Sequence, residues 1–166
     1  MAEISERKRV LILGGGFAGI NAAMEAAKLP VDITLIDRKN HHTFQPLLYQ
    51  VALAVLSPAE IAQPIRSILR NHRNIEVLMD EAVGFDVAQR HVQLKTGAEF
   101  EYDYLIVATG STHSYFGKDE WAKLAPGLKS GRKGGRSSLA AALSGSPCFP
   151  PVAEKSASAS QGGHLA

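Results

Sequence analysis

The glycine run at residues 14–19, which reads Gly-Gly-Gly-Phe-Ala-Gly, constrains the fold of this 166-residue chain more than any other feature. It follows the apolar segment Val10–Leu13, which is typical of a buried strand, and precedes a segment of small residues. A second apolar segment, Ile33–Ile36, ends at Asp37. This order predicts a strand, a tight turn, a helix and a second parallel strand, the βαβ unit that binds dinucleotides.

The spacing of the glycines gives each one a role. Gly14 permits a tight turn, Gly16 lets a pyrophosphate approach the backbone, and Gly19 lets the helix lie close to the strand. The helix would begin at Phe17 and Ala18, where unpaired N–H groups and the helix dipole favour phosphate. Glycine turns also occur in loops that bind nothing, so a purely structural turn is the alternative.

Asp37 lies 18 residues after Gly19, at the expected carboxyl end of the second strand. Its carboxylate can accept hydrogen bonds from both hydroxyl groups of a ribose, whereas an Arg or Ser here would have indicated a 2′-phosphate. Arg38 follows directly, so the 2′-phosphate is not fully excluded. The alternative for Asp37 is a solvated turn residue.

Composition narrows the function classes. The net charge of +2 divides into −2 over residues 1–128 and +4 over residues 129–166, without a basic patch in the first part, so we expect no nucleic-acid binding. Cys148 is the only cysteine, which excludes a disulfide framework and predicts a reducing, cytoplasmic location. The apolar stretch Leu47–Leu56 is too short to span a bilayer, so no transmembrane helix is expected.

Between the second strand and residue 70 the pattern favours helices. Residues 38–49 read as a loop, in which His41 and His42 form a solvated turn rather than a metal site. Leu47–Leu56 predicts a short helix. Ser57-Pro-Ala-Glu60 is a capping box with proline at the first helical position, which predicts a second helix to about Arg70, kinked at Pro64.

The next segments favour strands. Ile75–Met79 predicts a parallel strand, and three short runs predict an antiparallel meander: Val83–Val87, His91–Leu94 and Glu99–Tyr102. Tyr104–Ala108 predicts a buried strand that ends in a sharp turn at residues 109–111. The expected fold class is α/β, a Rossmann-like parallel sheet with a small antiparallel meander.

The amino-acid composition of the chain changes after Leu128. Of the 38 residues from Lys129 on, 24 are Ser, Ala, Gly or Pro. Such a segment cannot bury enough apolar area to offset its ordering entropy, which predicts a disordered tail over residues 129–166. Residues 1–7 are expected to form a flexible N-terminus.

Several segments together resemble the type II NADH dehydrogenases, single-subunit NADH:quinone oxidoreductases of the two-dinucleotide-binding-domain flavoproteins. The resemblance covers residues 8–128 and rests on the glycine turn at 14–19, on Asn40-His-His-Thr-Phe-Gln-Pro-Leu-Leu-Tyr-Gln-Val-Ala52 and on Tyr102-Asp-Tyr-Leu-Ile-Val-Ala-Thr-Gly-Ser111. The middle segment is the most specific. The resemblance implies that residues 8–128 form a partial FAD-binding Rossmann domain.

The resemblance also implies site residues. The glycine turn would hold the FAD pyrophosphate, Asp37 with its neighbour Arg38 the adenosine ribose, and Gln45 and Pro46 would lie beside the flavin. The backbone near Val83 would pair with adenine, although Val83 alone reads as an ordinary strand residue. Phe44 and Leu47, which flank Gln45 and Pro46, could equally be core. The segment that closes over the cofactor would comprise Ala108, Thr109 and Gly110.

The chain also departs from that family. The family has a second GxGxxG unit for NADH, a quinone site and C-terminal membrane-binding helices, and we expect none of these after Leu128. This predicts a truncated or frame-shifted gene. Three interpretations stay open: an NADH dehydrogenase-like flavoprotein fragment, a nucleotide-binding module that needs a partner chain, and an inactive remnant. For the assembly, a homodimer also stays open. The residues predict no catalytic acid, no nucleophile and no metal site.

The tail prediction is testable by limited proteolysis. Trypsin should cut the native protein first at four basic residues of the tail, because a mobile segment enters a protease readily: Lys129, Arg132, Lys133 and Arg136. Mass spectrometry of the first fragments measures this. Protection of these four sites in the native protein, with cleavage after denaturation, would show that the tail is docked.

Overall fold

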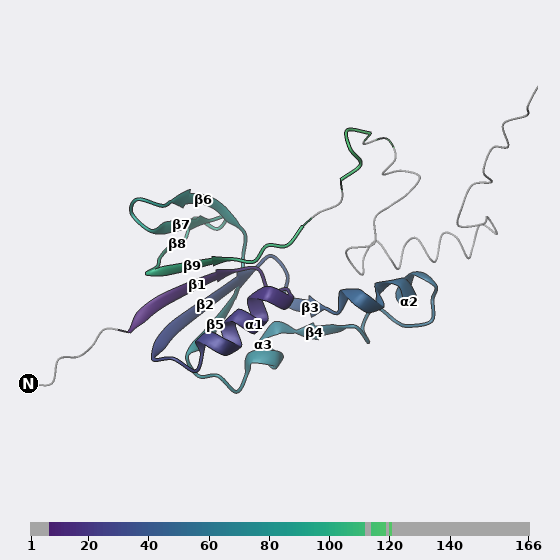
Figure 1. The fold of residues 1–166 in the computed structure, drawn as a ribbon, viewed down its shortest axis with the longest axis horizontal. Helices are drawn as coiled ribbons and strands as arrows, with labels where there is room; N and C mark the ends of the chain where they lie inside the picture. The colour runs from purple at the N-terminus through teal and green to yellow at the C-terminus, as the bar shows by residue number, and fades with distance from the viewer. Residues whose placement is uncertain (1–6, 112–113, 119, 121–166) are drawn as a thin grey trace, which may run out of the picture.

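The computed structural model describes residues 7–111, 114–118 and 120, which form a mixed α/β fold (Figure 1). Its main sheet has four parallel strands in the order β5-β2-β1-β9. They are β1 (Lys8–Leu13), β2 (Val31–Asp37), β5 (Ile75–Met79) and β9 (Tyr104–Val107). Strands β2 and β5 add to one side of β1, and β9 pairs with its other side, which confirms the predicted Rossmann-type sheet. The predicted burial of β9 is wrong, because it is an edge strand whose Tyr104 and Val107 are exposed.

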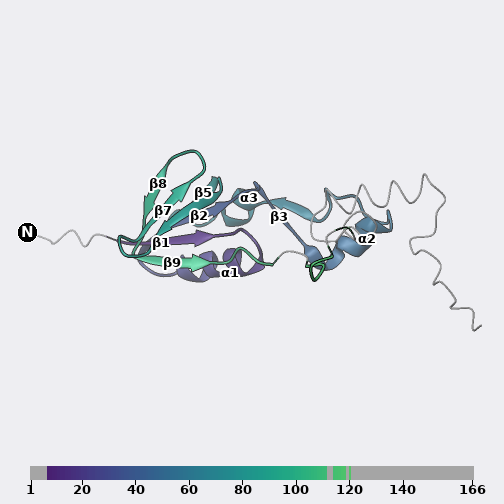
Figure 2. The same cartoon turned by 90° about the horizontal axis from the view of Figure 1, so that it is seen from above.

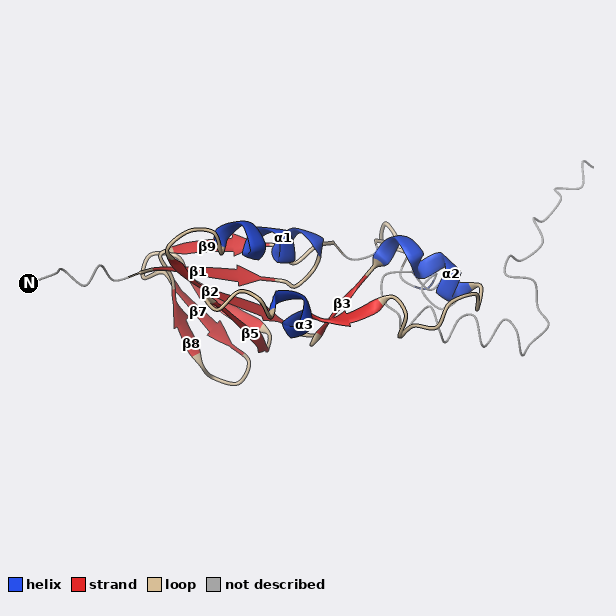
Figure 3. Ribbon diagram, turned by 90° about the horizontal axis from the view of Figure 1, so that it is seen from below, coloured by secondary structure: helices blue, strands red, loops and turns tan. Residues whose placement is uncertain are grey.

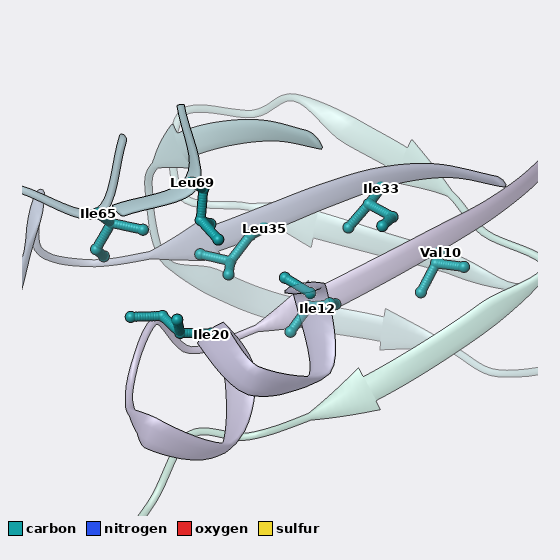
Figure 4. Packing of buried hydrophobic residues seen from close by; sticks show 8 residues of the cluster. Val10, Ile12, Ile20, Ile33, Leu35, Ile65 and Leu69 are labelled. Atoms are coloured by element: carbon teal, nitrogen blue, oxygen red, sulfur yellow. The ribbon is translucent and has the colours of Figure 1, made fainter. Parts of the chain in front are cut away.

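Helix α1 (Phe17–Ala26) covers one face of this sheet, and α3 (Ile65–Leu69) packs beside it. Ile20 and Ala23 are buried on one side of α1, and Met24 and Ala27 pack against the same cluster. Figure 4 shows side chains from the strands and both helices pointing into one layer. The buried members of this cluster are Val10, Ile12, Ile20, Ala23, Ile33, Leu35, Ile65 and Leu69.

The antiparallel meander covers the opposite face, so that the parallel sheet lies between it and α1 (Figure 2). It consists of β6 (Ala82–Asp86), β7 (His91–Leu94) and β8 (Glu99–Glu101), as the sequence predicted. Its Val92 and Leu94 pack with Leu11 and Leu13. Strand β1 is apolar at every position from Val10 to Leu13 because alternate side chains enter two different cores.

A two-stranded ribbon extends from the main sheet as an arm, which we define as residues 41–64 (Figure 3). It is formed by β3 (His41–Thr43) and β4 (Ala62–Pro64), with the 3₁₀ helix η1 (Gln45–Leu47) and α2 (Leu48–Ala52) between them. The arm has a small hydrophobic core of its own, formed by Leu48, Val51 and Ile61. The short helix predicted over 47–56 is therefore present but ends at Ala52.

The long helix predicted from Ser57 is wrong. The capping contacts do form, because Ser57 N–H donates to Glu60 Oε2 (2.5 Å) and Ala59 N–H donates to the Ser57 hydroxyl oxygen (3.2 Å). They close only one turn, since the chain then extends into β4 and pairs with β3. Pro64 disfavours helical geometry in the residue before it, so the helix begins only at Ile65.

The predictions for residues 1–6 and for the tail over 129–166 lie outside the described residues, so they stay predictions. Among the residues that the structure describes, no helix has the length and apolar character needed to cross a membrane.

The closure of β9 onto β1 gives a prediction of pH-dependent stability. Asp103 Oδ2 accepts the Arg9 backbone N–H (2.7 Å), and its Oδ1 lies 3.3 Å from Lys8 Nζ. The Arg9 N–H, and after it the Lys8 ammonium, lower the pKa of Asp103 below its usual value. The resulting stabilisation is fully present above the ordinary aspartate pKa of about 3.9 and is lost as pH falls through the lowered value.

We therefore expect Asp103→Asn to lower the melting temperature at neutral pH, because the substitution removes the charge. The difference from wild type should shrink as pH falls from about 4 through the lowered pKa of Asp103, because the carboxylate is protonated first in the unfolded chain and then in the folded protein. Thermal denaturation across this pH range measures it. Asp32→Asn, which removes an exposed carboxylate 3.5 Å from Arg7, is the control and should have the smaller effect. A difference that is independent of pH would contradict the argument.

Candidate nucleotide-binding site

A cavity of about 970 Å³ lies at the carboxyl ends of the parallel strands. Its walls come from the glycine turn after β1, the end of β2, the residues after β5, the arm and the residues after β9. Ligands of open α/β sheets bind at this edge, outside the carboxyl ends of the strands. The fold alone therefore places the cavity where a nucleotide would be expected.

The glycine turn has the geometry that the sequence predicted. Gly14 has a φ of +106°, and a Cβ there would overlap the Ala108 carbonyl. A Cβ at Gly19 would overlap the carbonyl of Gly14, so only glycine lets α1 begin this close to the turn. A Cβ at Gly16 would meet no atom within 4 Å, which leaves open space at the turn for a ligand.

Helix α1 points its amino end into this cavity. Gly16 is the N-cap, and Phe17 and Ala18, the first two helical residues, line the cavity. The N–H groups of a first helical turn have no partners within the helix and carry a partial positive charge. No acidic side chain occupies the first turn of α1. The end of the helix is thus suited to a phosphate group.

Asp37 ties the turn to the end of β2. Its Oδ2 accepts the Gly15 N–H (2.6 Å) and its Oδ1 accepts the Lys39 N–H (2.7 Å). The side chain is half-buried and lines the cavity. Asp37 is therefore more than a solvated turn residue, because it fixes the glycine turn in place. Each carboxylate oxygen retains a further lone pair for a ligand hydroxyl.

A group of charged residues forms another wall, and the sequence interpretation missed part of it. Glu81 Oε1 lies 3.2 Å from Arg38 Nη1, and its Oε2 lies 3.5 Å from Lys95 Nζ. The Thr96 hydroxyl donates to Asp80 Oδ2 (2.5 Å), and this bond, followed by the Glu81 N–H, lowers the pKa of Asp80. The position of Asp80 and Glu81 directly after β5, at the carboxyl edge of the sheet, was the signal that could have identified them.

The arm supplies the remaining wall, and here the predicted solvated turn at His41 and His42 is wrong. Both residues belong to β3. His42 is half-buried, its Nδ1 lies 3.2 Å from the Gly15 carbonyl oxygen, and its ring meets the Phe17 ring edge-on at 4.7 Å. Phe44 in turn lies 5.5 Å from Phe17, centroid to centroid. The arm thus contacts the glycine turn directly.

The structure brings most of the predicted site residues together. Ten line the cavity: Gly14, Gly16, Phe17, Ala18, Asp37, Arg38, Gln45, Ala108, Thr109 and Gly110. Three do not: Gly19 is buried beneath the turn, Pro46 lies outside the lining, and Val83 is 57% exposed. Ala82, the neighbour of Val83, does line the cavity. Further lining residues were not predicted as site residues from the sequence: Gly15, Lys39, His42, Thr43, Asp80, Glu81, Phe85 and Ser111.

Known proteins share this architecture. Residues 8–137 match the family of pyridine nucleotide-disulphide oxidoreductases. The chain is 48% identical over 132 residues to the type II NADH:quinone oxidoreductase Ndh of Mycobacterium tuberculosis, and 46% identical over 129 residues to NdhA of the same organism. These alignments cover 78% and 76% of this chain but only 28% and 27% of the relatives, so the chain spans about a quarter of their length.

Solved structures agree with these relatives. The sulfide:quinone oxidoreductase of Aquifex aeolicus superposes with a TM-score of 0.75 at 25% identity, over 82% of this chain and 32% of that one. The NDH2 of Plasmodium falciparum in complex with NADH gives 0.72 at 26% identity, over 80% and 28%. The resemblance to NADH dehydrogenase-like flavoproteins is confirmed, and the chain belongs to the pyridine nucleotide-disulphide oxidoreductase family.

Proposed function

We propose that the cavity binds FAD and that this chain is the FAD-binding part of an NADH:quinone oxidoreductase. One observation carries the proposal: Gly16, the amino end of α1 and Asp37 all line the same cavity, and the space beside Gly16 is open. The names of the type II NADH:quinone oxidoreductases among its relatives support the same reaction class.

The residues present fit a dinucleotide. The N–H groups at Gly16, Phe17 and Ala18 would hold the pyrophosphate, and the free lone pairs of Asp37 would accept ribose hydroxyls. The backbone near Ala82 would pair with adenine, and Gln45 and Gly110 would lie toward the flavin. A volume of about 970 Å³ is at the upper end of the roughly 300–1,000 Å³ usual for cofactor sites.

FAD would supply the redox chemistry, by accepting a hydride from NADH and passing its electrons to a quinone. The protein residues described above bind and orient it, and none of them is needed as a general acid or nucleophile. In the whole protein the quinone would be met at a membrane, on the cytoplasmic face, and a homodimer is one candidate assembly. A nucleotide-binding module that works with a partner chain is the second candidate, favoured by the single glycine turn of the described residues.

Cofactor binding can be separated from folding at the turn. Gly16→Val should leave the melting temperature of the FAD-free protein near that of wild type, because a Cβ there meets no atom within 4 Å. It should weaken FAD binding, because the side chain fills the space for the pyrophosphate. Gly19→Val is the matched contrast and should destabilise the fold itself, since its Cβ would overlap the carbonyl of Gly14. Flavin fluorescence titration and thermal denaturation give the two readouts.

Asp37→Ala should weaken FAD binding by about 1–3 kcal/mol, because it removes the ribose acceptor and leaves the Gly15 N–H without a partner. Asp32→Ala is the control, since Asp32 stands on the same strand, at the end remote from the cavity. Equal FAD affinity in wild type, Gly16→Val and Asp37→Ala would refute the assignment of the site.

The chain alone should not turn over NADH with a quinone. Hydride transfer needs the nicotinamide held roughly 3–3.5 Å from the flavin, and one glycine turn cannot hold FAD and NADH at the same time. The assay follows the loss of nicotinamide absorbance with a soluble quinone and added FAD, and free FAD without protein is the control. Sustained turnover above that background would mean that a partner copy or another segment supplies a nicotinamide pocket.

A further inference from the structure

We propose that His42 is a positioning residue that couples the arm to the glycine turn, so that the cavity is shaped for a ligand that contacts both the arm and the turn. The proposal rests on the proposed function, because FAD is the ligand expected to reach from the turn to the arm. Its basis is the hydrogen bond between the His42 ring and the Gly15 carbonyl, which joins residues 27 positions apart in the chain.

The partner of His42 fixes the proton on its ring. A backbone carbonyl oxygen can only accept a hydrogen bond, so Nδ1, which lies 3.2 Å from the Gly15 oxygen, must carry the hydrogen. In the neutral ring Nε2 is then the nitrogen with the lone pair. The structure therefore assigns His42 the Nδ1–H tautomer, which can be measured independently of any ligand.

The ring of His42 is also held in orientation. Phe17, the first residue of α1, meets it edge-on with an interplanar angle of 88°. Phe44, which follows β3, packs against Phe17 at 71°. Edge-to-face pairs of this kind favour one relative orientation of the rings. Two contacts of different kinds thus fix the arm against the turn and the start of α1.

Gly15 is fixed from both sides as a result. Its N–H donates to Asp37 at the end of β2, and its carbonyl accepts from His42 on the arm. A Cβ at Gly15 would meet the end of the Ile65 side chain, which would have to shift to make room. Asp37 therefore holds Gly15 to the sheet, and His42 adds the link from Gly15 to the arm.

Loss of the His42 contact should therefore affect two ligands differently. ADP would occupy only the glycine turn and the ribose site beside Asp37. Asp37 still holds Gly15 there when the His42 contact is lost. FAD must also fit against the arm, so its affinity should fall more. A single hydrogen bond contributes a net factor of about two to ten, and this is the expected increase in the FAD dissociation constant.

The experiment uses the full chain and three substitutions of His42. His42→Asn keeps an N–H near the position of Nδ1 and should restore most of the FAD affinity. His42→Gln, with its N–H one bond further out, and His42→Phe, which keeps a ring without the N–H, should show the two- to tenfold loss. His72→Asn, at a histidine outside the cavity lining, is the matched control and should bind FAD as wild type does.

Nitrogen-15 NMR of the imidazole rings tests the contact itself and should show hydrogen on Nδ1 of His42. Three outcomes would overturn the inference: hydrogen on Nε2, equal losses of ADP and FAD affinity, or His42→Phe binding FAD as wild type does. Failure of the wild-type chain to bind FAD in the same titration, with ADP still bound, would instead refute the proposed function and with it this inference.

Discussion

The close approach of Gly19 to the carbonyl of Gly14 is the constraint on which the rest of the structure depends. No Cβ fits there, so α1 can begin immediately above the end of β1. That position lays Ile20 and Ala23 against the sheet and turns the amino end of the helix toward the strand ends. Packing and the orientation of free N–H groups thus follow from one missing methyl group.

The parallel sheet, the glycine turn and the place of Asp37 could be predicted from the sequence, because apolar runs and single glycine and aspartate positions indicate them locally. Strand β1 is buried on both faces from Val10 to Leu13, so it reads as a continuous rather than an alternating apolar segment. The glycines mark positions where a side chain is sterically impossible, and Asp37 marks the end of a strand. Such features need no knowledge of distant contacts.

The failures lie where distant pairing overrides a local signal. The capping box at Ser57 forms its hydrogen bonds, yet the chain beyond it pairs with β3, some twenty residues earlier. The same pairing draws His42 out of an expected turn and places it against Gly15. Asp80 and Glu81 reach the cavity only because β5 lies next to β2. Local propensity carries no information about these neighbours.

The order of strands in the sheet also has a consequence for folding during synthesis. Strand β1 pairs with β2 early, but its other neighbour is β9, where Val10 pairs with Tyr104. At roughly 5–20 residues per second, a ribosome needs about 5 to 20 s to make the 94 residues that follow Val10, up to and including Tyr104. For that time β1, which is apolar from Val10 to Leu13, has one open edge, exposed to pairing with other chains and available to chaperones.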